Sequence, residues 1–93
     1  MDMKKATRVY IFGIVQGVFF RAFVKEVADK LNVKGYVRNK EDSSVEVWIE
    51  GRQEDVEKMI EECKQGPKHA VIKRFDILEE KFQGFDEFKI LSI

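Results

Sequence analysis

The spacing of apolar residues changes period several times along the chain, and this order of periods constrains the fold more than any other feature. Over residues 45–50, valine or isoleucine recurs at every second position, which is the period of a half-buried strand. Over residues 20–31, apolar residues recur at helical spacing and charged residues fill the opposite face. A chain with both patterns must combine strands with helices.

The same reasoning assigns the rest of the chain. The expected strands are residues 8–15, 33–39, 45–50, 70–78 and 85–90, and the expected helices are residues 20–31 and 53–64. Asn32 tolerates the left-handed conformation that ends a helix, and Gly66 and Pro67 stop the second helix. The order βαββαβ with a short extra C-terminal strand predicts an α+β, ferredoxin-like fold. It places two helices on one face of an antiparallel sheet.

Length and composition limit the classes of protein that the chain can represent. Its 93 residues have room for one core, so we expect a single domain over residues 1–93. Lys plus Arg and Asp plus Glu number 17 each, which gives no overall charge to attract nucleic acid or an anionic membrane. No apolar run approaches the roughly 18 residues of a membrane span. The single cysteine excludes an internal disulfide and fits a reducing compartment, so we expect a cytoplasmic protein.

The segment GIVQGVFFR, residues 13–21, contains the first candidate site. Two glycines bracket a turn that leads directly into a helix, so several backbone amides converge before intrahelical bonding begins. Such a concavity attracts anions, and Arg21 just inside the helix can donate a charge-assisted fork to phosphate oxygens. Taken alone, however, such a segment is more often only a tight turn followed by a solvated arginine, because a loop that leads into a helix is common.

Asn39 is the second candidate. The first two strands run in the same direction because a helix crosses back between them, so the loop after the first strand and the end of the second share one sheet edge. Asn39 has the side-chain parity of Val37, an obvious core residue. Asn39 should therefore point to the helix-covered side, near the start of the first helix.

These residues carry a resemblance to a known family. GIVQGVFFR, followed 18 residues after Arg21 by Asn39 in GYVRN, resembles the two signatures of the acylphosphatase family, commonly GxVQGVxFR and a glycine, an aromatic residue, V, x and N. The resemblance continues through VEVWIEG, QEDVEKMI, QGP and the closing FKI, and covers nearly the whole chain. Two positions depart from the pattern. Ile14 stands where the family often has Arg or His, and Ser43 stands where it usually has a glycine.

The resemblance implies hydrolysis of a carboxyl–phosphate anhydride to carboxylate and phosphate, without metal or cofactor. Arg21 matches the arginine that binds the phosphoryl group, and Asn39 matches the asparagine that orients the attacking water. The phosphate-binding amides are those of Gln16, Gly17, Val18, Phe19, Phe20 and Arg21. The implied partner is a small acyl phosphate such as acetyl or carbamoyl phosphate, and a monomer is expected. Ile14 is expected to alter substrate affinity, and Ser43 the hairpin turn, since serine enters positive φ less readily than glycine.

Other readings remain open. A non-enzymatic module could use the same loop to bind phosphate or carbamoyl phosphate, as acylphosphatase-like domains do within larger carbamoyl-transfer maturation proteins. The chain begins at Met1 and ends after its last expected strand, so we expect an independent enzyme instead. An RNA-binding domain would need an exposed aromatic pair, for which Tyr36 and Trp48 are the only candidates; we expect them to pack across strands. Cys63 is expected to be a buried apolar residue, and His69 a loop residue without a metal-binding role.

Overall fold

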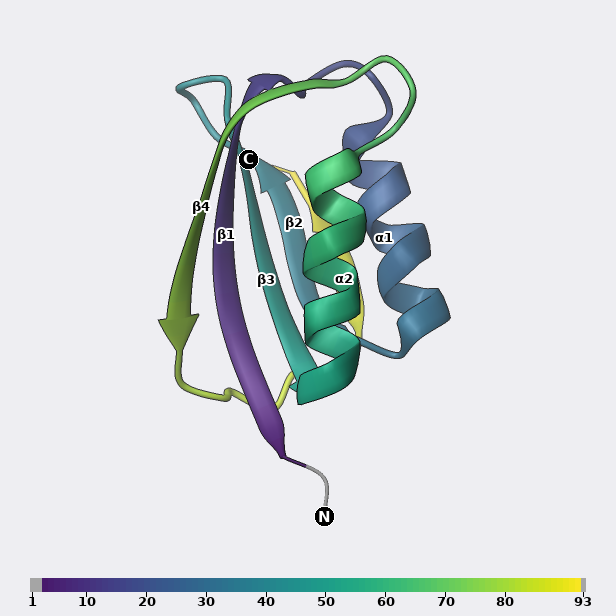
Figure 1. Ribbon diagram of the computed structural model, residues 1–93, viewed down its shortest axis with the longest axis vertical. Coiled ribbons are helices and arrows are strands. Elements are labelled where there is room, and N and C mark those ends of the chain that lie inside the picture. The colour runs from purple at the N-terminus through teal and green to yellow at the C-terminus, as the bar shows by residue number, and fades with distance from the viewer. Residues whose placement is uncertain (1–2, 93) are drawn as a thin grey trace.

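The computed structural model describes residues 3–92, which form a five-stranded sheet with two helices on one face (Figure 1). The elements are β1 (Lys4–Ile14), α1 (Phe20–Leu31), β2 (Lys34–Asn39), β3 (Val45–Arg52), α2 (Gln53–Gln65), β4 (Val71–Glu80) and β5 (Phe88–Leu91). The strands lie in the order β4-β1-β3-β2-β5. Neighbouring strands are antiparallel except for β2 and β5, which are parallel. The predicted α+β, ferredoxin-like fold with an extra C-terminal strand is confirmed.

Two predicted strand starts were wrong by at least three residues, while the other boundaries differ by two residues or fewer. β1 begins at Lys4 instead of Arg8, because its first residues pair with the end of β3, where Lys4 lies opposite Arg52. β5 begins at Phe88 instead of Phe85, because the Phe85 amide donates its hydrogen bond to a side chain and not to a neighbouring strand. Both differences depend on where distant segments of the chain lie.

The hydrophobic core fills the space between the sheet and the two helices. Alternate residues of the central strands, such as Val9, Val37 and Val47, are fully buried there. The residues of α2 predicted to point inward are all buried, namely Val56, Met59, Ile60 and Cys63. Burial raises the pKa of the Cys63 thiol to about 12, so it stays protonated at neutral pH and behaves as an apolar residue. None of the helices that the structure describes is long and apolar enough to span a membrane.

The other face of the sheet has no helix, but residues 81–87 cross it from the end of β4 to the start of β5; we call this segment the strap (Figure 1). Phe85 in the strap packs on Trp48 with ring centroids 5.9 Å apart, and Tyr36 stacks on Trp48 at 6.3 Å. Trp48 is consequently only 5% exposed. The predicted cross-strand packing is confirmed, and this aromatic pair offers no flat exposed platform.

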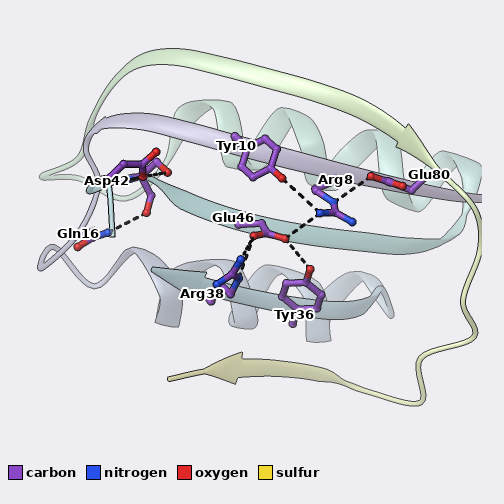
Figure 2. A network of polar contacts seen from close by, with 9 residues as sticks. Arg8, Tyr10, Gln16, Tyr36, Arg38, Asp42, Glu46 and Glu80 are labelled. Atoms are coloured by element: carbon purple, nitrogen blue, oxygen red, sulfur yellow. Dashed lines mark hydrogen bonds and ion pairs between the residues drawn. The ribbon is translucent and has the colours of Figure 1, made fainter. Parts of the chain in front are cut away.

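A buried carboxylate organises the polar groups on the same face. Glu46 accepts hydrogen bonds from Tyr36 Oη at 2.7 Å and from Arg38 Nε at 3.0 Å, and Arg8 Nη1 lies 3.6 Å away (Figure 2). Burial, together with the hydrogen bond to Glu46, raises the pKa of Tyr36 to about 12. Arg8 Nε also lies 3.0 Å from Glu80, so two arginines balance two carboxylates on this face of the sheet.

Candidate active site

The loop between β1 and α1 lies at the same end of the sheet as the β2–β3 hairpin (Figure 1). Gly13 and Gly17 bracket it for different reasons. A Cβ on Gly13, whose φ is 137°, would collide with the backbone carbonyl of Val71 on β4. Gly17 has open space around it, but its φ of 72° is a conformation that residues with side chains rarely adopt. The loop conformation therefore requires glycine at both positions.

The start of α1 leaves backbone donors available. The first hydrogen bond leading into the helix runs from the Phe23 amide to the Phe19 carbonyl, at 3.0 Å. Among residues 3–92, no backbone carbonyl accepts from the amides of Phe20, Arg21 or Ala22, as is usual in the first turn of a helix. The positive end of the helix dipole adds to the attraction that these amides exert on an anion.

A pocket of about 320 Å³ lies at this helix end. Its lining residues are Val15, Gly17, Phe19, Phe20, Arg21, Ala22, Asn39 and Ile90. Arg21 from α1 and Asn39 from β2 thus share one pocket, on the helix-covered side of the sheet, as the parity of Asn39 with Val37 predicts. Of the six loop residues expected to bind phosphate, four line the pocket and two, Gln16 and Val18, do not.

A backbone carbonyl near the C-terminal end of the sequence holds the Arg21 side chain. Its Nη1 donates to the backbone carbonyl of Leu91 on β5, at 3.1 Å. A guanidinium carries several N–H donors in a planar fork, so this bond fixes its orientation and still leaves donors for an anion. No sequence pattern indicates Leu91, because a backbone carbonyl can belong to any residue type.

Asn39 has an unusual hydrogen-bonding state. Its Oδ1 atom is buried, and within the described part of the chain no group donates a hydrogen bond to it. A buried amide oxygen without a donor is uncommon, because it loses its hydration without replacement. Asn39 lines the same pocket as Arg21, so its amide group is close to any small polar molecule bound there.

The Gln16 side chain supports the loop from outside the pocket. Its Nε2 donates to the carbonyls of Lys40 and Ser44, each at 2.9 Å, and so ties the loop to the β2–β3 hairpin turn. Figure 2 shows Gln16 beside this turn, which includes Asp42. Only the backbone amide of Gln16 is therefore left for the predicted phosphate role. Val18 packs against the hydrophobic core, so its side chain also takes no part in the pocket.

The remaining sequence candidates lie apart from this pocket. Ser43 has a φ of 74°, which confirms that the hairpin turn places a serine in the left-handed region. Ile14 is 54% exposed at the end of β1, opposite Val71, and does not line the pocket. His69 is exposed in the loop before β4, and the described residues include no group of three side chains suited to a metal ion.

The fold and the pocket together define a ferredoxin-like α+β protein with a pocket at the start of its first helix. Residues 7–90 match the family model for acylphosphatase. The acylphosphatase of Syntrophus aciditrophicus is 46% identical over 90 residues, covering 96% of this chain and 94% of that protein. The acylphosphatase of Pyrobaculum aerophilum is 44% identical over 93 residues, covering 98% and 97%.

Solved structures agree with these sequence matches. The crystal structure of an acylphosphatase from Bacillus subtilis superimposes with a TM-score of 0.91 at 32% identity, covering 96% of this chain and 99% of that one. HypF from T. kodakarensis superimposes with a TM-score of 0.84 at 41% identity, but the match covers 98% of this chain and only 12% of HypF. The chain belongs to the acylphosphatase family and is a hydrolase of small acyl phosphates.

Proposed function

We propose that Arg21 and the amides of residues 16–21 bind the phosphoryl group of the substrate, and that Asn39 orients the water that attacks it. One observation carries this proposal: Asn39, whose buried amide oxygen receives no hydrogen bond within the described chain, lines the same pocket as Arg21 and the start of α1. The reaction needs both hydrogen-bond donors for the phosphoryl oxygens and an acceptor that orients the water. Phosphoryl transfer depends mainly on charge stabilisation and on the position of the nucleophile.

In the proposed reaction, the phosphoryl oxygens accept hydrogen bonds from Arg21 and the loop amides. The water donates a hydrogen bond to Asn39 Oδ1, and its oxygen lone pair attacks phosphorus. The P–O bond to the acyl group breaks, the electron pair leaves on the carboxylate, and the water proton passes to phosphate or solvent. The conjugate acid of a carboxylate has a pKa of about 4, so the leaving group needs no proton at neutral pH.

Phosphate release from acetyl phosphate, measured with a chelator present, tests the reaction directly. p-Nitrophenyl phosphate is the control substrate, because it is a phosphate monoester whose p-nitrophenolate leaving group is more basic than a carboxylate. We expect release from acetyl phosphate and little from the monoester. Release from the monoester alone would contradict the proposed substrate class.

Two variants test the residues. Arg21→Ala and Asn39→Ala should each lose about 3 to 5 kcal/mol of transition-state stabilisation, a roughly 10²- to 10⁴-fold fall in kcat/KM for acetyl phosphate. Arg74→Ala, which removes an exposed arginine paired with Asp76 on β4, is the matched control and should retain the wild-type rate. Folded Arg21 and Asn39 variants that work at the wild-type rate would refute the assignment.

A second candidate function is phosphate or carbamoyl phosphate binding without hydrolysis. The match to a small part of HypF favours it, since one matching HypF structure is described as phosphate- and nucleotide-bound. The same assay separates the two functions. Phosphate bound stoichiometrically, with no turnover of acetyl or carbamoyl phosphate, would support the binding module.

A further inference from the structure

Phe19 occupies a position that a phenylalanine does not suit. It is the N-cap residue, immediately before α1, with φ 59° and ψ 25°, and its side chain makes no capping hydrogen bond. Asn, Asp, Ser or Gly is favoured there, and left-handed backbone is costly for a bulky residue. The ring is also 85% exposed, the highest value among the large apolar residues that the structure describes. Neither helix capping nor core packing accounts for this residue.

The ring lies at the pocket that holds Arg21 and Asn39. Phe20, the next residue, is 1% exposed and anchors α1 in the core, so the two aromatic neighbours have different roles. Ile90 on β5 contributes a second exposed apolar surface to the same pocket, with 42% of its area accessible. Strained backbone with exposed apolar surface at a site is a reason to look for a ligand contact.

The two ends of an acyl phosphate require different surroundings. Arg21, the α1 amides and Asn39 provide for the phosphoryl group and water, while the acyl group must extend toward the pocket mouth. Arg21 is the only charged side chain among the pocket-lining residues described by the structure. A charged acyl group therefore finds no partner beyond Arg21, whereas an aromatic acyl group can cover Phe19 and Ile90 and remove apolar surface from water.

We propose that Phe19 and Ile90 form an apolar rim that contacts the acyl group, so that the enzyme prefers aromatic acyl phosphates to acetyl phosphate. This inference rests on the proposed function of Arg21 and Asn39. The preference should be expressed in KM, because the contact is made in the ground state as well as in the transition state.

The test compares kcat/KM for benzoyl phosphate with kcat/KM for acetyl phosphate in each protein. Phe19→Gly removes the ring at a backbone conformation that glycine accepts, and should lower this ratio roughly tenfold. Ile90→Thr keeps a β-branched residue on β5 and should lower the ratio by about threefold. Phe19→Tyr, which keeps the ring, should retain the wild-type ratio. Phe82→Ala removes an exposed phenylalanine of the strap and is the matched control.

The outcomes separate this inference from the proposed function. An unchanged ratio in active Phe19→Gly enzyme would overturn the rim, as would an equal loss with both substrates, which would indicate a role for Phe19 in loop conformation alone. Wild-type protein that hydrolyses neither substrate would instead refute the proposed function. The rim would be supported if Phe19→Gly lowered the ratio by raising KM for benzoyl phosphate while Phe19→Tyr kept the wild-type ratio.

Discussion

Within residues 3–92, two parts of this protein present a group of neighbouring backbone amides, but only in one of them does a carboxylate of the same chain accept their hydrogen bonds. In the strap, the amides of Gln83, Gly84 and Phe85 donate to the Glu50 carboxylate at 2.7 to 2.9 Å, and Trp48 Nε1 donates at 2.9 Å. At the start of α1, the amides of residues 20–22 have no backbone acceptor within the described chain.

The difference separates a stabilising arrangement from a functional one. Glu50 is fully buried, so its hydrogen bonds fix the strap against the sheet in every folded molecule. At the α1 end, we propose that the same kind of donor is left for a substrate that arrives and departs. We therefore expect changes at Glu50 to lower stability, and changes at Arg21 or Asn39 to lower turnover.

Glu50→Ala should give the largest loss of stability. It leaves three strap amides and the Trp48 indole N–H without their acceptor, and unsatisfied donors cost about 1 to 3 kcal/mol each when they stay buried. Because part of the strap can turn toward water, we expect a fall of about 3 kcal/mol in the free energy of unfolding, measured with urea. The exposed Glu79→Ala is the control. A Glu50→Ala protein with wild-type stability and no activity would remove the distinction between the two regions.

The acid dependence of stability should report on the same carboxylate with a smaller effect. Burial alone would raise the pKa of Glu50, but the hydrogen bonds from the strap amides and Trp48 outweigh it and hold that pKa below its ordinary value. A lowered pKa in the folded state contributes stability above the unfolded value, about 4.3, and this stability disappears as the pH falls through the folded value.

Urea unfolding of wild type and Glu50→Gln between pH 7 and pH 3 checks this expectation. The wild-type protein should lose more stability over the acidic part of the range than the variant, whose side chain does not titrate. Identical slopes in the two proteins would mean that the strap amides do not stabilise the charged form of Glu50.

The sequence predicts the covered side of the molecule better than the open side. Strand and helix periods, and the parity of Asn39, identify which residues meet in the core because both follow from local geometry. Glu50 has the outward parity of a half-buried strand and looks solvated in the sequence. Whether a strap covers it depends on the path of residues 81–87, which no local pattern encodes. For the same reason, the sequence prediction wrongly began β5 at Phe85 instead of Phe88.

Gln16→Leu tests whether the Gln16 side chain holds the β1–α1 loop in place, since no carboxylate among the described residues does this as Glu50 does for the strap. The change removes two hydrogen bonds to the Lys40 and Ser44 carbonyls, so we expect a loss of about 1 to 2 kcal/mol in stability. Turnover of acetyl phosphate should also fall, because the loop carries the proposed phosphate amides. Gln65→Leu, at the exposed end of α2, is the matched control. Unchanged turnover would show that the loop holds its shape without the hairpin.

Ser43→Gly should produce the smallest effect, on the hairpin turn that Gln16 contacts. Ser43 has a φ of 74°, which strains a residue with a Cβ, while glycine adopts it freely but loses more entropy on folding. The net result should be a gain of about 0.5 to 1 kcal/mol in the free energy of unfolding. Ser44→Gly should do the opposite, since Ser44 is buried and its hydroxyl donates to Asp42. A Ser43→Gly protein less stable than wild type would mean that the serine side chain stabilises this turn by more than the strain it introduces.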